Sequence, residues 1–187
     1  MARLHRYSLN FSAGFADLPD SATPRRQTSR RHSSNPIEVI AGIANRNAWP
    51  LHCAGDDELA LAVEGKCDDY QVFFTWLSDL EVFHLACVFE MRVPEERRPE
   101  VQRLIACINE QLWLGHFDLW MEDGTVVFRQ SLLLVGGATA TARQCEVMLG
   151  AALDACERYH PAFAFVMAAE NAGNALEATL FETAGEA

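Results

Sequence analysis

The chain has 187 residues and half of them are hydrophobic, which is enough for one domain with a sizeable core and excludes a wholly disordered protein. Its formal net charge is −11. Of its 15 basic and 26 acidic residues, residues 1–34 hold six arginines and two aspartates, so the remainder carries nine basic and 24 acidic residues, or −15. Such an acidic body repels phosphate backbones, so we expect the folded part not to bind nucleic acid.

Residues 1–34 are rich in Arg, Ser, Thr and Pro and are predicted to form a disordered basic tail. Two alternatives stay open for this tail: weak contact with nucleic acid or an anionic surface, and a role as a transit peptide. Residues 35–187 are predicted to form a single α+β domain. We find neither an apolar run of about 20 residues nor a secretory signal, so we expect a cytoplasmic protein that makes no membrane contact. The six cysteines are expected to be free thiols.

The first predicted elements are a helix and a group of strands. Asn35 is a capping residue, Pro36 takes the first helical position, and apolar residues then recur at helical spacing as far as Pro50. Alternating apolar residues predict strands over 59–63, 70–76 and 83–91, with a short edge strand over 51–53. Short turns between them predict an antiparallel meander.

The second half is predicted to contain two helices and a hairpin. An apolar stripe predicts a helix over about 95–114 that stops at Gly115. Two alternating runs, 117–121 and 126–134, flank an Asp-Gly turn, which is a strong hairpin signal. The last helix is predicted to begin after Thr139 or Thr141, and Pro161 is expected to kink or break it. Helices set against an antiparallel sheet give an α+β fold class.

The sequence offers little to carry catalysis. It has no CxxC, no HExxH, no GxSxG and no P-loop, so we expect no metal, no cofactor and no catalytic residue. The nearest metal candidate, His52-Cys53 with Cys67, fails because adjacent strand residues point to opposite faces. His84 and His116 are expected to be half-buried and hydrogen-bonded.

The aromatic residues are the most informative group. Phe73 and Leu77 lie opposite Phe74 and Trp76 on their strand, so that strand is apolar on both faces. Either the helices cover both sides of the sheet, or one side meets a second copy or a partner; both readings stay open. The candidate contact residues for a dimer or a partner are Trp76, Trp113, Trp120 and Phe128.

Several segments resemble the bacterial YbjN-domain proteins, a family labelled sensory transduction regulators. They are Asn-Pro-Ile-Glu-Val-Ile (35–40), Ala-Leu-Ala-Val-Glu-Gly (60–65), Phe-Thr-Trp (74–76), His-Leu-Ala-Cys (84–87), Ile-Asn-Glu-Gln-Leu-Trp-Leu-Gly-His-Phe-Asp-Leu-Trp (108–120) and Ala-Cys-Glu-Arg-Tyr (155–159). The chain departs from the family where relatives often carry a Gly-Lys turn, because it reads Met-Ala-Ala-Glu-Asn there.

The resemblance implies a fold similar to type III secretion chaperones: a twisted antiparallel sheet of five to six strands packed with three helices, usually dimeric, without catalytic residues. We therefore expect a non-enzymatic, homodimeric protein-binding module that is chaperone-like or regulatory. The alternative is a regulatory domain that senses a small ligand in a pocket between sheet and helices.

Overall fold

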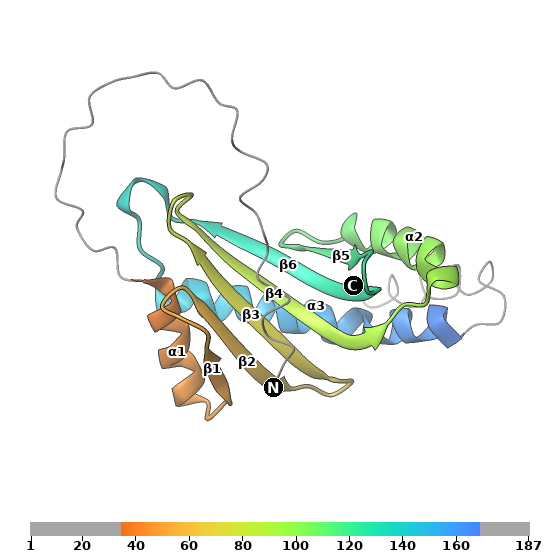
Figure 1. The fold of residues 1–187 in the computed structure, drawn as a ribbon, viewed down its shortest axis with the longest axis horizontal. Coiled ribbons are helices and arrows are strands. Elements are labelled where there is room, and N and C mark those ends of the chain that lie inside the picture. Colours follow the sequence, from red (N-terminus) through yellow and green to blue (C-terminus); the bar gives the residue numbers. More distant parts are fainter. Residues whose placement is uncertain (1–34, 169–187) are drawn as a thin grey trace, which may run out of the picture. The chain divides into compact units, whose positions relative to one another are not determined.

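A computed structural model describes residues 35–168 of the chain (Figure 1). Helix α1 spans Pro36–Arg46, and its start is the one that the sequence predicts. The side-chain oxygen of Asn35 accepts a hydrogen bond from the backbone N–H of Ile37 at 3.0 Å, and Pro36 occupies the first turn. The predicted tail over 1–34 lies outside the described residues, as does the chain beyond 168.

Six antiparallel strands form one sheet in the order β1-β2-β3-β4-β6-β5. The strands are β1 (Leu51–Cys53), β2 (Glu58–Glu64), β3 (Asp69–Leu77), β4 (Val82–Arg92), β5 (His116–Trp120) and β6 (Thr125–Leu133). The meander from β1 to β4 and the hairpin of β5 and β6 are both as predicted. β6 pairs with β4, which leaves β5 at the edge of the sheet.

Two short 3₁₀ turns and two further helices complete the described chain. The turns are Glu95–Arg97 and Val135–Gly137, and the helices are α2 (Arg98–Asn109) and α3 (Ala142–Ala168). α2 ends at Asn109, earlier than predicted. There the Asn109 side chain accepts a hydrogen bond from the backbone N–H of Phe117 at 2.8 Å and donates one to the Phe117 carbonyl at 3.0 Å, which ties the end of the helix to β5.

Pro161 was predicted to kink or break the last helix; α3 continues through it to Ala168, so of these two alternatives the break is excluded. Buried residues lie on both sides of the proline, namely Tyr159, Ala162, Phe163 and Val166. Packing of this face onto the sheet offsets the loss of the single backbone hydrogen bond that a proline cannot donate.

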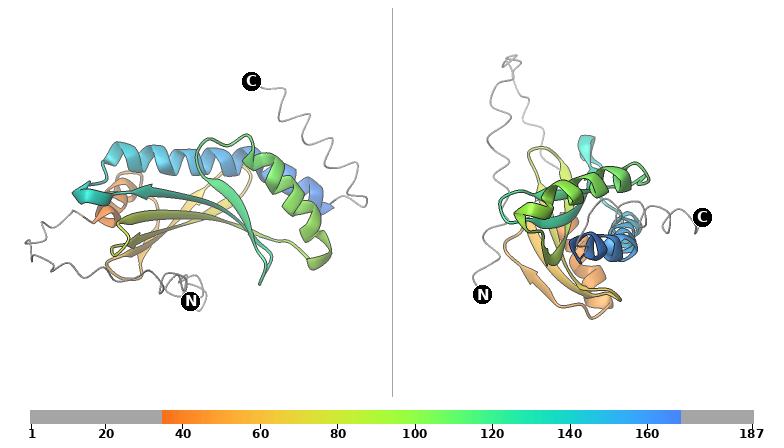
Figure 2. Two further views of the ribbon diagram at one scale, coloured as in Figure 1. Left: turned by 90° about the horizontal axis from the view of Figure 1, so that it is seen from above. Right: turned by 90° about the vertical axis from the view of Figure 1, so that its right-hand side faces the viewer.

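The main core lies between the sheet and the three helices. It joins the buried faces of α1, α2 and α3 to alternate residues of the strands, and the rings of Phe89, Phe117 and Phe163 meet at its centre. Figure 2 shows the three helices on one side of the sheet, which curves around them. The predicted fold class, an antiparallel sheet of five to six strands with three helices, is confirmed.

The reading in which the helices cover both sides of the sheet is wrong. The buried residues of all three helices belong to the main core, whereas the second hydrophobic cluster consists of strand residues alone. We call the second side, which no helix among residues 35–168 covers, the open face. Within the same range no helix combines the length and the apolar composition needed to cross a membrane.

Candidate functional site

Strand alternation and register decide which side chains form the open face. Phe74 and its partner Leu85 point into the main core, so Phe73 and its partner Ala86 point to the other side. Ala86 is in turn paired with Arg129, and Val88 with Val127. The open face therefore runs across β3, β4 and β6 in register.

An apolar cluster occupies the middle of the open face. Ala86 and Val88 are 5% exposed and Val127 is fully buried, and the larger side chains of Phe73 and Trp120 pack against them. We call these five residues the open-face cluster. The face of an antiparallel sheet that carries no helix is usually polar, so an apolar cluster at this place is a departure from the common pattern.

A polar group borders the cluster. The Arg129 guanidinium donates to Nε2 of His84 at 3.4 Å and lies 3.4 Å from the Asp118 carboxylate. Burial of His84, together with the nearby Arg129 charge and His116, lowers the pKa of His84 to about 4. His84 is therefore neutral at pH 7 and its Nε2 accepts the hydrogen bond that orients Arg129. The arrangement places one fixed guanidinium beside an apolar patch.

Exposed aliphatic side chains extend the open face toward the β3–β4 turn. Leu133, at the end of β6, is 66% exposed, and it pairs with Val82, which in turn pairs with Leu77. Leu80 in the turn is 44% exposed. Arg129 and Ser131 lie between Val127 and Leu133 on this face of β6, so Leu133 and Val82 form a second apolar area that is separate from the open-face cluster.

The structure does not bring the four predicted contact residues together. Trp120 lies in the open-face cluster, and Trp76 lies on the opposite side of the sheet, packed against the main core. Trp113 is 98% exposed in the connection between α2 and β5. The ring of Phe128 is fully buried against Phe117 in the main core, so among residues 35–168 it presents no surface to a partner.

Sequence reasoning missed most of the open face. Ala86, Val88, Val127 and Arg129 were not among the candidates, although residues 82–89 form a nearly continuous apolar run, which is typical of a strand buried on both sides. That run was the available signal. It identifies two-sided burial, but only the register shows that Val88 meets Val127 and that both lie under Trp120.

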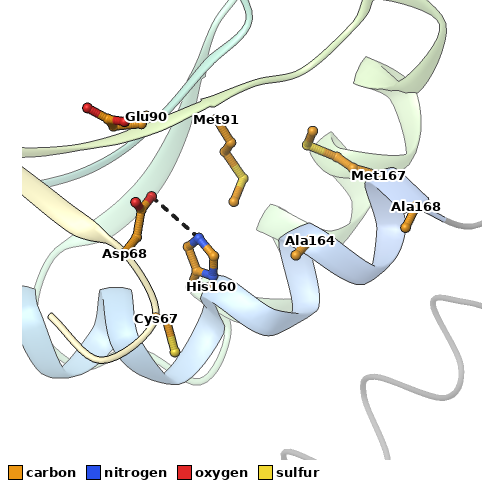
Figure 3. A pocket seen from close by; sticks show the side chains of 8 residues that line it. All are labelled: Cys67, Asp68, Glu90, Met91, His160, Ala164, Met167 and Ala168. Carbon is orange, nitrogen blue, oxygen red and sulfur yellow. Dashed lines mark ion pairs between the residues drawn. The ribbon is translucent and has the colours of Figure 1, made fainter.

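A shallow depression of about 660 Å³ lies on the helix side, between the β2–β3 turn, β4 and the last turns of α3 (Figure 3). His160 Nε2 lies 3.5 Å from the Asp68 carboxylate at its edge. The remaining lining residues are Cys67, Glu90, Met91, Ala164, Met167 and Ala168. Within residues 35–168 no three His, Cys, Asp or Glu side chains are grouped so that they hold a metal ion.

The family model described as "Putative bacterial sensory transduction regulator" matches residues 36–165, which is more than half of the chain. The chain belongs to the YbjN family. The resemblance seen in the sequence segments is thereby confirmed for the folded part. No curated protein sequence matches this YbjN-family chain.

Two solved structures are similar to this YbjN-family domain. One is a chain from the crystal structure of the ExsC–ExsE complex, with a TM-score of 0.53 at 20% identity, covering 70% of this chain and 94% of that one. The other is the crystal structure of YbjN, a putative transcription regulator from E. coli, with a TM-score of 0.48 at 10% identity, covering 67% of this chain and 91% of that one. At these identities the first likeness shows a shared fold.

Proposed function

We propose that this YbjN-family domain is a non-enzymatic regulatory module of the cytoplasm that binds another protein on its open face. One observation carries the proposal: five apolar residues, Phe73, Ala86, Val88, Trp120 and Val127, gather on a side of the sheet that no helix of residues 35–168 covers. The family description as a regulator supports it, and so does the shared fold with a chain from a two-protein complex.

Charge and geometry indicate the chemistry of the partner. Strand alternation places Glu58, Glu64 and Asp69 around the open-face cluster, and the chain outside residues 1–34 carries −15. The partner is therefore a protein segment that has apolar side chains for the cluster and basic side chains for the rim. Its apolar side chains supply the affinity, and the charges guide its orientation.

Photo-crosslinking from defined positions tests this surface in the full chain. A crosslinking residue at Ala62 or Gln71 samples the open face, and one at Asp154 on α3 serves as the control. We expect one defined protein to be attached from the open-face positions and not from Asp154. Attachment of the same protein from all three positions, or from Asp154 alone, contradicts the proposed surface.

A matched pair of substitutions separates binding from stability. Leu133→Arg places a charge on the open face, at a position where the native side chain is 66% exposed. Val147→Arg, the control, places the same charge on α3, where the native side chain is 44% exposed. Neither removes a buried side chain, so both variants are expected to keep the melting temperature of the parent. Only Leu133→Arg is expected to reduce capture of the crosslinked partner; equal capture by the two variants contradicts the proposal.

We also propose that the protein is a homodimer, which the chaperone-like fold favours. Light scattering on the purified full chain measures its mass directly. A mass of one chain at micromolar concentration contradicts the dimer without affecting the open face.

The depression around His160 favours a second candidate, a small-ligand sensor. Its combination of an ion pair, Asp68–His160, with apolar Met91 and Met167 suits a small molecule that has a polar and an apolar end. A thermal-shift screen tests it. If one class of metabolite raises the melting temperature of the parent but not of the Met91→Glu variant, the sensor is favoured. If no metabolite raises the melting temperature of the parent, this candidate is excluded.

A further inference from the structure

The depression on the helix side of the sheet is lined by two methionine thioethers and an imidazole. His160, Ala164 and Met167 follow one another at i, i+4 and i+7, so they lie on one face of α3. Met91 reaches toward this face from β4, with His160 on one side of its end and Met167 on the other (Figure 3). Ala164 has no side chain beyond its Cβ, which leaves the hollow open between them.

The Asp68 carboxylate stands beside this imidazole at a distance that suits a shared metal ion. His160 Nε2 and the Asp68 oxygen are 3.5 Å apart, beyond the usual hydrogen-bond length of about 2.9 Å. A nitrogen and an oxygen that bind one tetrahedral ion at about 2.1 Å each lie about 3.4 Å from one another. The side chains of His160 and Asp68 are 16% and 22% exposed, so an ion between them is largely shielded from water.

The surrounding structure holds these side chains in position. The Phe89 ring packs against the His160 ring, with the ring centroids 5.5 Å apart, and both methionines are partly buried against the main core. The backbone N–H of Lys66 donates to the Glu157 carboxylate at 2.7 Å, which ties the β2–β3 turn to α3. The three segments that line the depression are therefore joined before a ligand binds, and such preorganisation lowers the cost of binding.

The donor atoms select the kind of ion. Thioether sulfur is a soft ligand that suits copper(I), whereas magnesium and calcium take sets of oxygen ligands. Two thioethers and a neutral imidazole carry no charge, so together with the Asp68 carboxylate they balance a single positive charge. Glu90, which also lines the depression, is exposed to solvent, where its charge attracts cations. No three His, Cys, Asp or Glu side chains within residues 35–168 are grouped to hold a metal ion, so an ion at this place depends on the two methionine sulfurs.

We propose that Met91, Met167 and His160 bind a soft monovalent metal ion, copper(I), with Asp68 beside the ion to balance its charge. This inference rests on the second candidate function, the sensor, because it names the ligand of the same depression. The ion joins the β2–β3 turn, β4 and the end of α3, so its binding stabilises the folded chain.

Nuclear magnetic resonance of the methionine methyl groups tests the site in the full chain. Silver(I), a soft monovalent ion that does not change its oxidation state under these conditions, is the probe. Cys53→Ser and Cys67→Ser remove the two exposed thiols that also take up silver, and Met91→Leu and Met167→Leu assign the two methyl signals. Met121, which is 51% exposed and lies outside the depression, is the matched control. We expect silver to shift the signals of Met91 and Met167 together and to leave that of Met121 in place.

Two further variants test the other members of the site. His160→Gln and Asp68→Asn are each expected to lower the silver affinity at least about tenfold. The melting temperature of each variant without silver shows whether it is folded. Silver is expected to raise the melting temperature of the protein that keeps His160 and Asp68 more than that of either variant.

Two results overturn the inference: signals of Met91 and Met167 that stay in place, or an equal shift of Met121, which indicates that silver binds any accessible thioether. The metabolite screen separates this inference from the sensor. If a metabolite raises the melting temperature but silver leaves the signals of Met91 and Met167 in place, the metal site fails and the sensor stands. If silver shifts these two signals alone and no metabolite raises the melting temperature, the metal site stands and the organic ligand fails.

Discussion

Lowering the pH from 7 to 5 is expected to destabilise the domain through His84. This side chain is 9% exposed, and its burial beside Arg129 and His116 lowers the pKa to about 4 from an ordinary value of 6.5. Above pH 6.5 His84 is neutral in both the folded and the unfolded chain and has no effect. Between pH 6.5 and 4 the unfolded chain binds a proton that the folded chain excludes, so the free energy of unfolding decreases as the pH falls.

The size of the effect follows from the two pKa values. Inside this window the free energy of unfolding decreases by about 1.4 kcal/mol for each pH unit. Between pH 7 and pH 5 the decrease amounts to about 2 kcal/mol. This is a large part of the stability of a typical domain. The effect levels off below pH 4, where the folded form also binds the proton.

Urea unfolding, followed by tryptophan fluorescence at pH 7, 6 and 5, measures this loss. The control is His84→Gln, which keeps an acceptor for Arg129 but does not titrate. Carboxylates contribute equally to both proteins, so they cancel in the comparison. We expect the parent to lose about 2 kcal/mol more than the variant between pH 7 and 5. The same pH dependence in both proteins refutes the reasoning, because His84 then titrates near its ordinary value.

Further substitutions test other parts of the structure by the same unfolding measurement. Asn109→Ala removes both hydrogen bonds to the backbone of Phe117 and is expected to cost about 2 kcal/mol, whereas no loss means that water replaces them. Gly115→Ala is expected to cost clearly more than Gly137→Ala: both glycines have a positive φ, +70° and +80°, but only at Gly115 does an added Cβ overlap the Phe128 ring. Gly150→Ala, inside α3 with no atom within 4 Å of the added carbon, is expected to raise stability by about 0.5–1 kcal/mol, and a decrease shows that the helix face is covered. Trp113→Ala is expected to leave stability within about 0.5 kcal/mol of the parent because the side chain is 98% exposed, and a larger loss places this tryptophan in the core.

Local patterns in the sequence predict most of the secondary structure and the fold class. The start of α1 follows from Asn35 and Pro36 in adjacent positions, because a capping side chain and a fixed φ act within one turn. The hairpin of β5 and β6 follows from an Asp-Gly turn between two alternating runs. These signals are short-range, so they are readable without the rest of the molecule. The sequence left a kink or a break open at Pro161, and α3 is not broken there because Ala162, Phe163 and Val166 pack through contacts that are distant in sequence.

The sequence by itself determined that the third strand has two apolar faces, and that the chain contains no CxxC, HExxH, GxSxG or P-loop motif. Only the tertiary structure decided which of these faces lies in the core. Helix positions settle that question, and they place Phe128 and Trp76 on the covered side and Trp120 on the open side. Alternation states that neighbouring side chains point in opposite directions, but it does not say where the helices pack. The open face with its polar neighbours, His84, Arg129 and Asp118, joins four strands and exists only once the register of β3, β4, β5 and β6 is set.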